Sequence, residues 1–448
     1  KFFVFFTDPR ITDLSMQLSF TGCTFMGLFT ELELPCNLEP RLLRRYETLV
    51  KEHTIVNPSN APGVKALANH QQAWSFTQAA WRFFNNDNVT FPMLAEPLFA
   101  LAREAATTSN SSFLLVAHDW CRCNFRKHNS KLDKTQMSHA LDVGYELQAS
   151  LLIDGSSGKP LAPLGLNLVS SRGVYQCHEV TPQPTQGHLD ELVERIHRQD
   201  QLGLDKPLVH IIDREADSLP HLRQLMNTRW LTRCKKDSTL LHDGKSKRVE
   251  QIASCVPSEV IGRVSLRGRV GFLFVGETLV SLKRKTESRP DELVTARLVL
   301  SRVVDEAGKE LASWYLLSNV TEVSAREIAQ WYCWRWNIES WFKLLKSDGF
   351  HVEEWQQTSG EAVYRRLLVS SMACTLALKL YQDESEDAQE LKHFLIRLSG
   401  RVTKRSKPVT LPALLAGLYQ FIQMQEVMNT YTPEELQRLA KIASRYFG

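Results

Sequence analysis

Two short apolar runs, each carrying an aspartate near its end, constrain the fold of this chain more than any other feature. FLLVAHDW (113–120) contains Asp119, and KPLVHIID (206–213) ends in Asp213. Apolar runs of this length are typical of strands that are buried on both faces. Between them lies HLDELVERIHRQ (188–199), whose spacing predicts an amphipathic helix. The order of strands and helices predicts an α/β fold with a mixed sheet.

A third segment combines apolar residues at helical spacing with a row of polar groups. The segment is YCWRWNIESWFKLLK (332–346), and we interpret it as one helix. At about 100° per residue, its polar groups fall in a stripe roughly 80° wide. The stripe consists of Tyr332, Arg335, Glu339, Lys343 and Lys346, and the opposite, buried side of Trp334, Ile338, Trp341 and Leu345. An anionic ligand suits this stripe, although a solvated face with Glu–Lys pairs is the simpler alternative.

Five regions are expected along the 448 residues. Changes in hydrophobic period and polar linkers such as TTSNSS (107–112) set their boundaries. The regions are a helical N-terminal region (1–109), a first part of the α/β core (110–235), a β-rich insertion (236–320), a second part of the core with the Glu339 helix (321–381) and a helical C-terminal region (382–448).

Positive charge is concentrated in one part of the chain. The net charge is only +4, but residues 229–285 contain thirteen Lys or Arg against five Asp or Glu. Such a local excess of positive charge indicates a track for a polyanion. On charge alone, a basic surface insertion without a ligand is nearly as good an explanation.

No segment predicts a membrane-spanning or secreted protein. No apolar run approaches the length needed to cross a bilayer, and KFFVFFTDPR (1–10) is interrupted too early to be a signal peptide. The nine cysteines are scattered, which predicts reduced thiols in a cytoplasmic protein; nucleoid association is expected only from the family resemblance described below. Because the first residue is Lys1, we expect a fragment or a start assigned too early, with Met16 and Met26 as alternative starts.

Three carboxylates stand out as potential metal ligands. Asp119 and Asp213 each lie at the carboxyl end of a predicted strand, the edge of an α/β sheet where ligands gather. For either aspartate alone, turn or helix capping is the better explanation. Together with Glu339 they form the kind of oxygen-ligand set that Mg²⁺ prefers. Such a set can hold two ions about 3.5–4 Å apart and so support in-line phosphoryl transfer.

These residues resemble the signature of a known family. Tyr332, Arg335, Glu339 and Lys346 match the Y-x2-R-x3-E-x6-K signature of DDE transposases of the insertion-sequence-four family. DREAD (213–217) matches the family's segment around its second catalytic aspartate, and the similarity is greatest to relatives of the transposon-five transposase. Two further segments resemble its end-binding region and the last strand of its insertion, namely AWRFFNNDNVT (80–90) and WYLLSNV (314–320).

The resemblance implies an RNase H-like core in which Asp119, Asp213 and Glu339 are the catalytic triad and hold two Mg²⁺ ions, for which Mn²⁺ can substitute. Family members cut at transposon ends, in close relatives through a hairpin intermediate, and transfer the freed strand into target DNA. The implied partners are double-stranded DNA, both terminal inverted repeats and target, and a second copy of the chain in a synaptic complex. The N-terminal region is then expected to bind transposon ends, and the C-terminal region to mediate dimerisation.

Seven residues are assigned to DNA binding by the resemblance or by their place on the polar stripe. They are Tyr332, Arg335, Lys343, Lys346, Trp314, Arg233 and Lys235. Tyr332, Arg335 and Lys346 match residues that hold phosphates around a flipped base, and Trp314 matches the tryptophan that stacks on that base. Core packing is the rival role for Trp314. Arg233 and Lys235, which match positions on the end DNA, have ordinary surface cations as their alternative.

The resemblance leaves some alternatives open. Asp119 is followed by Trp-Cys, where relatives carry small hydroxyl residues, so Asp133 and Asp142 are alternatives for the first acid. His118, next to Asp119, is expected to orient that acid rather than to react. Among functions, the main competitor is a derivative that binds transposon ends without cutting them. Another RNase H-like nuclease and a carboxylate-pair glycosidase are weaker, and the basic insertion argues against the glycosidase.

Overall fold

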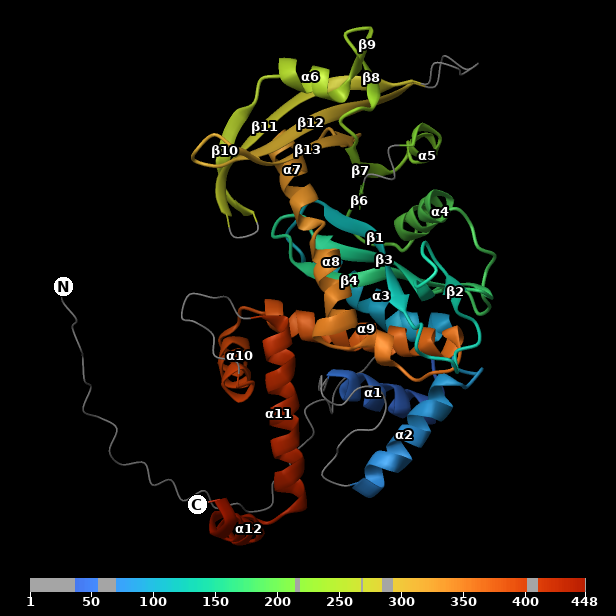
Figure 1. Cartoon of the computed structure of the whole chain (residues 1–448), viewed down its shortest axis with the longest axis vertical. Helices are drawn as coiled ribbons and strands as arrows, with labels where there is room; N and C mark the ends of the chain where they lie inside the picture. Colours follow the sequence, from blue (N-terminus) through green and yellow to red (C-terminus); the bar gives the residue numbers. More distant parts are fainter. Residues whose placement is uncertain are drawn as a thin grey trace, which may run out of the picture. The chain divides into compact units, whose positions relative to one another are not determined.

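The computed structural model describes residues 37–54, 70–213, 218–266, 269–283, 293–400 and 410–447 (Figure 1). The chain divides into two units, Lys1–Glu33 and Leu34–Gly448, and every described residue lies in the second. Met16, Met26 and residues 214–217 of the DREAD segment lie outside the described residues.

One mixed sheet runs through the described part of the chain. Its strands follow the order β5 (Gly173–Gln176), β4 (Pro160–Ser170), β3 (Val143–Asp154), β1 (Leu114–Asn124), β6 (Leu208–Ile212), β7 (Arg229–Cys234), β13 (Glu310–Ser318), β12 (Val294–Val304), β11 (Arg269–Leu282), β8 (Thr239–His242) and β9 (Lys245–Arg248), with β10 (Glu259–Leu266) on β11 and β2 (Thr135–Gln136) on β3. The β1–β6 and β6–β7 pairs are parallel, and the other described ladders are antiparallel. The predicted α/β class with a mixed sheet is confirmed, whereas its RNase H-like character stays a prediction.

The two apolar runs form neighbouring strands in this sheet. β1 and β6 pair in parallel, with Leu114 opposite Leu208 and Ala117 opposite Ile211. The side chains of β1 from Leu114 to Ala117 are fully buried, as the uninterrupted apolar pattern predicts. The predicted amphipathic helix is α4 (His188–Asp200), which leads into β6, an interior strand between β1 and β7.

Helices are found toward both ends of the described chain (Figure 1). They are α1 (Pro40–Thr54), α2 (His70–Phe84) and α3 (Phe91–Thr108) on the N-terminal side, and α9 (Gly360–Gln382), α10 (Glu386–Leu398), α11 (Leu411–Thr430) and α12 (Pro433–Phe447) on the C-terminal side. α9 packs against β4, α1 and α3 and is buried along most of its length. Within the described residues, no helix has both the length and the apolar character needed to cross a bilayer.

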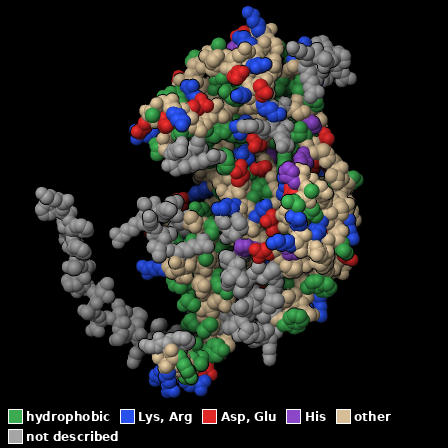
Figure 2. Space-filling model, viewed as in Figure 1, with side chains coloured by type: hydrophobic (Ala, Val, Ile, Leu, Met, Phe, Trp, Pro, Cys, Tyr) green, Lys and Arg blue, Asp and Glu red, His purple; other side chains and the backbone are tan. Residues whose placement is uncertain are grey.

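The last helix, α12, is amphipathic and exposed to solvent. Its apolar residues lie along one side, and Leu439, Ile442 and Tyr446 are 43%, 42% and 79% exposed. Figure 2 shows hydrophobic side chains over the lower part of α11 and over α12, next to basic side chains. A helix with such an apolar face normally buries it against another element.

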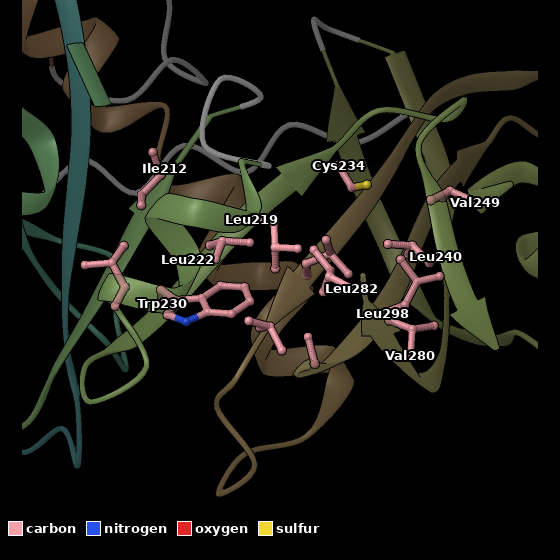
Figure 3. Packing of buried hydrophobic residues seen from close by; sticks show 14 of the residues in the cluster. Ile212, Leu219, Leu222, Trp230, Cys234, Leu240, Val249, Val280, Leu282 and Leu298 are labelled. Atoms are coloured by element: carbon pink, nitrogen blue, oxygen red, sulfur yellow. The ribbon is translucent and has the colours of Figure 1, made fainter. Parts of the chain in front are cut away.

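A hydrophobic cluster joins β7 to the strands of the predicted insertion (Figure 3). Trp230 of β7 is fully buried and belongs to the same cluster as Leu240, Val280 and Leu298. Leu222 enters the cluster from α5 (Leu219–Gln224), and α6 (Val249–Cys255) adds two more side chains. β7 and the insertion therefore share one core across residue 235, the predicted boundary between regions. The region boundaries themselves stay predictions.

The segment 332–346 is not the single helix that its periodicity predicts. α7 (Ala325–Trp334) ends first, α8 (Asn337–Lys343) follows, and a π-helical turn covers Leu344–Asp348. At the break, the N–H of Arg335 donates to the carbonyl of Tyr332 at 3.3 Å, and the N–H of Trp336 to that of Cys333 at 3.4 Å. These bonds span three residues instead of four, so the chain tightens locally.

The tightening changes which side chains face the solvent. Ile338, Trp341 and Leu345 are buried, as predicted. Tyr332 and Arg335 are also buried, at 2% and 4% exposed. The expectation that the polar stripe lies opposite the buried side therefore fails for these two residues, and Trp334, expected on the buried side, is only half-buried.

Candidate active site

The two aspartates extend from neighbouring strands at the same level of the sheet. The parallel ladder of β1 and β6 ends at the pair Ala117 and Ile211, and Asp119 and Asp213 each lie two residues further along. Burial raises the pKa of Asp119 above its ordinary value, and Arg335 and the N–H of Trp120 only partly offset this effect. Asp213 follows β6 as predicted, but Asp119 lies inside β1, which runs on to Asn124, and not at the end of its strand. The parallel pairing that ends just before them places the two acids at the same level.

Arg335 connects all three predicted acids. Its Nη1 lies 3.1 Å from Oδ2 of Asp119, and its Nη2 lies 3.0 Å from Oε1 of Glu339 and 4.0 Å from Oδ2 of Asp213. The rings of Tyr332 and Trp336 lie 5.7 Å and 5.6 Å from the guanidinium carbon, within range of cation–π attraction. The spacing of Arg335 and Glu339, four residues apart across the start of α8, lets the two side chains meet.

The charge of Arg335 is stabilised by its surroundings. Burial opposes the charged guanidinium, but Tyr332 and the three carboxylates outweigh burial and raise the pKa of Arg335. The hydroxyl of Tyr332 donates to Oδ1 of Asp213 at 3.0 Å. Burial and the nearby Asp213 raise the pKa of Tyr332, so its phenol stays protonated and remains a donor. The site therefore contains three carboxylates, one permanent cation and one neutral donor.

The helices that carry these groups are fastened to the turn between β3 and β4. The indole N–H of Trp331 donates to the carbonyl of Gly155, and the side-chain amide of Asn337 donates to the carbonyl of Gly158, both at 2.9 Å. Gly158 has a φ of +72°, and a Cβ at this position would collide with the indole ring of Trp334. Through these contacts with the flanking residues Trp331, Trp334 and Asn337, the turn between β3 and β4 helps to position Arg335 and Glu339.

Lys346 contacts groups outside the triad. Lys346 pairs with Oε1 of Glu353 at 3.0 Å and donates to the backbone carbonyl of Arg122 on β1. Glu353 also accepts a hydrogen bond from the backbone N–H of Asn124 at 2.8 Å. Lys343 is exposed on α8. Both lysines lie on the helical segment that carries Glu339, but Lys346 is engaged by Glu353.

The remaining predicted DNA-binding residues lie on the insertion side of the site. Trp314 is half-buried on β13, opposite Ser301 of β12. Arg233 lies on β7 and is close enough to Tyr332 to lower its pKa. Lys235 follows β7 and is exposed. In the described parts of the chain, no hydrogen bond or ring contact joins Trp314 to the three acids.

The two alternatives for the first acid are used elsewhere. Asp133 is 1% exposed and accepts hydrogen bonds from the hydroxyl of Tyr145 at 2.6 Å and from the backbone N–H of Gly360 at 2.8 Å. It thereby holds the start of α9. Asp142 forms an ion pair with Arg122 at 3.1 Å. Of the three aspartates considered, Asp119 is the one that contacts Arg335.

Sequence reasoning missed a buried hydrogen-bond chain below the two aspartates. Nε2 of His118 lies 2.9 Å from Nδ1 of His210, whose Nε2 lies 3.1 Å from Asp200. On the other side, Nδ1 of His118 lies 2.9 Å from the hydroxyl of Ser150, which accepts from Arg195 at 2.9 Å. The hydrogen-bond chain joins β1, which carries Asp119, to β6, which precedes Asp213. The signal for it was a histidine at an inward position of each apolar run.

The three carboxylates are suited to a divalent metal for two reasons: oxygen ligands of this kind bind such ions, and all three already contact one cation, Arg335. Their oxygens are the ligands that Mg²⁺ and Mn²⁺ take, and the guanidinium of Arg335 stands in for a cation that all three contact. In the described ranges, however, no set of three or more His, Cys, Asp or Glu side chains is close enough together to hold a metal ion. For the three carboxylates to close around a metal ion, the guanidinium of Arg335 has to move away from between them.

Comparisons with known proteins place similarity to a known domain in the central part of the chain. Residues 175–376 match the family described as the transposase DDE domain. This range includes Asp213, Arg335 and Glu339, whereas Asp119 lies before it. No curated protein matches the sequence. A cryo-EM structure of the piggyBac transposase synaptic complex with hairpin DNA is similar over 91% of this chain and 74% of that chain, with 9% identity and a TM-score of 0.37.

The family match supports the prediction of a DDE transposase domain. The matched part of the chain is similar to transposase DDE domains. The match does not separate the insertion-sequence-four family from other DDE transposases, and it names no metal and no DNA intermediate.

Proposed function

We propose that this chain is a DDE transposase of the insertion-sequence-four type, which cleaves DNA at transposon ends and joins the freed strand to target DNA. Asp119, Asp213 and Glu339 are its catalytic acids. The observation that carries the proposal is the meeting of these three carboxylates at Arg335, within or next to the part of the chain that matches the transposase DDE domain. Other carboxylates of the core, such as Asp133, serve to hold helices instead.

The three acids would hold Mg²⁺, or Mn²⁺ in its place. Bound there, the metal lowers the pKa of a water or 3′-hydroxyl nucleophile and stabilises the departing oxygen. The protein's own groups position the reacting phosphate. Tyr332 keeps Asp213 oriented through its 3.0 Å hydrogen bond, and the basic residues Lys343 and Lys346 lie further along the same helical segment, where they neutralise the DNA backbone.

The remaining predicted residues are assigned to the end DNA. Arg233 and Lys235 contact the backbone beside the site, and Trp314 stacks on a flipped base during a hairpin step. The protein works as a homodimer in a synaptic complex with two terminal inverted repeats. The helical N-terminal region recognises the repeats, and the C-terminal region mediates dimerisation.

A second function, supported by one observation, is a protein that binds transposon ends without cutting them. Arg335 occupies the space among the three acids, and the described side chains do not close around a metal as they stand. A derivative that keeps this arrangement when DNA is bound would grip DNA and leave it intact.

An excision assay separates the two functions. A marker is placed between the element's own terminal repeats, and the full chain is supplied in trans. We expect excision by the wild-type chain and by Asp142→Asn, and none by Asp119→Asn, Asp213→Asn or Glu339→Gln. Asp142→Asn is the matched control, since this acid pairs with Arg122 rather than with Arg335. If no form excises the marker but the chain still retards a terminal-repeat duplex in a gel, the protein only binds ends.

A further inference from the structure

One guanidinium lies among the three carboxylates of the proposed site and offsets part of their charge. Asp119, Asp213 and Glu339 all lie within 4.0 Å of a nitrogen of Arg335, which is 4% exposed. Carboxylates brought together repel one another unless a cation lies among them. Arg335 is therefore the counter-ion that lets the acids approach one another in the free protein.

Arg335 is held differently from Arg297 and Arg365. Arg297 donates to Glu277 and also to the backbone carbonyls of Val320 and Val323. Arg365 likewise donates to backbone carbonyls, as well as to Glu361. The hydrogen bonds of Arg335 go to the side chains of Asp119 and Glu339. The buried Arg195, like Arg335, is held by side chains, those of Ser150 and Glu191.

One nitrogen of Arg335 is left over in this arrangement. Its Nε is buried and has no hydrogen-bond partner among the described residues. A buried donor without a partner is costly, which indicates a group that acquires a partner in another state of the protein. Among the described residues, carboxylates and two aromatic rings hold the guanidinium of Arg335, so a group that takes over the carboxylates also releases it.

We propose that Arg335 is a displaceable counter-ion, which occupies the three carboxylates in the free protein and competes with a divalent metal for them. This inference rests on the proposed function, because it places the metal at these same carboxylates. A divalent cation seeks the oxygens that the guanidinium now contacts. The free protein consequently binds metal weakly.

A phosphate shifts this competition. A guanidinium binds phosphate through the same paired N–H groups that it uses for carboxylates, and the free Nε of Arg335 adds a donor. A DNA phosphate that takes up Arg335 leaves the carboxylates to the metal. By linkage, metal then strengthens DNA binding by the same factor. Arg335 thus delays metal loading until substrate DNA is bound.

The test measures Mn²⁺ binding to the full chain without DNA, from the loss of the electron paramagnetic resonance signal of free Mn²⁺. Arg335→Gln removes the competing charge, and we expect it to bind Mn²⁺ about tenfold more tightly than wild type. The matched control is Arg326→Gln, which removes an exposed cation from α7. It should change the affinity by less than about twofold, because exposed charges are screened. Equal affinities for wild type and Arg335→Gln overturn the proposal.

Two further variants keep the test decisive. If Arg335→Gln does not fold, Arg335→Lys is used. Its single ammonium contacts fewer of the carboxylates, so this variant should bind Mn²⁺ more tightly than wild type. An unchanged affinity for Mn²⁺ overturns the proposal. Asp213→Asn should lose Mn²⁺ binding. If Asp213→Asn binds Mn²⁺ as wild type does, the metal lies elsewhere, and the metal site of the proposed function is refuted. If Asp213→Asn loses Mn²⁺ binding but Arg335→Gln has no effect, only the counter-ion role of Arg335 is refuted.

Discussion

The ammonium group of Lys346 lies between the carboxylate of Glu353 and the backbone of β1. Because this ion pair is partly exposed, its loss in Lys346→Ala should lower the free energy of unfolding by no more than about 1 kcal/mol. If Lys346 holds a phosphate, the same variant should bind a terminal-repeat duplex more weakly and with a salt dependence reduced by about one charge. Fluorescence anisotropy at several salt concentrations and urea unfolding measure the two effects.

Glu353→Gln is the natural counterpart to that variant. It releases Lys346 from its carboxylate partner, so it should bind the duplex more tightly than wild type. Weaker binding by Glu353→Gln, or loss of folding in Lys346→Ala, would show that Lys346 serves the fold rather than DNA.

His118 makes the stability of the protein depend on pH. Burial, together with His210 and Arg195, lowers the pKa of His118 well below its ordinary value of 6.5. Below about pH 6.5 the unfolded chain takes up a proton that the folded chain does not, so stability is complete above this pH and falls as the pH is lowered. The free energy of unfolding, measured with urea from pH 7.5 to 5.5, should fall by up to about 1.4 kcal/mol per pH unit from this group. His118→Asn should reduce the dependence of the unfolding free energy on pH. If the slope against pH is unchanged in this variant, groups other than His118 cause the dependence.

At the scale of elements, the turn between β3 and β4 is the support for α7 and α8. Gly158 combines a φ of +72° with contact to the indole ring of Trp334. Gly158→Ala should therefore lower the free energy of unfolding by about 2 kcal/mol or more, through both backbone strain and the clash. Gly203→Ala is the control, because Gly203 has a φ of +68° with nothing within 4 Å of its would-be Cβ. It should cost only about 1 kcal/mol. Equal losses in the two variants would contradict a role for the contact with Trp334.

The strands and most helices could be predicted because their signals are local. The apolar runs of β1 and β6 and the spacing of α4 each lie within a dozen residues, and the structure places them where the patterns do.

The break between α7 and α8 could not be predicted in this way. Arg335 and Trp336 keep right-handed helical conformations, and neither Gly nor Pro marks the position. The break is set by contacts with residues distant in sequence, such as those of Trp331 and Asn337 with the turn at 155–158. Helical periodicity therefore predicts Arg335 on the polar stripe, opposite the buried side of the helix. Tertiary contacts instead bury Arg335 and direct it toward Asp119. The partners of Asp133 were hidden for the same reason.

At the scale of the whole molecule, α12 presents an apolar face that nothing covers within the described residues. Glu434 and Glu435 lie in its first turn and Arg445 in its last, so two copies packed antiparallel would place opposite charges together. We expect Leu439→Glu with Ile442→Glu to convert a dimer to a monomer in light scattering, with little change in unfolding, because both residues are exposed. Lys441→Glu on the polar side of α12 is the control. A monomeric wild-type chain would remove this role from α12.

The cluster around Trp230 bears on how this protein can be divided. β7 pairs with β13, and the two share a core with the strands between them. A shortened chain in which residues 236–320 are replaced by a linker would remove the side chains that the insertion adds to the cluster of Trp230 and Leu222. The insertion is thus no removable attachment: anyone seeking a minimal catalytic fragment will have to keep it, and genetic exchange of this segment between related proteins will succeed only where the side chains facing Trp230 are exchanged with it.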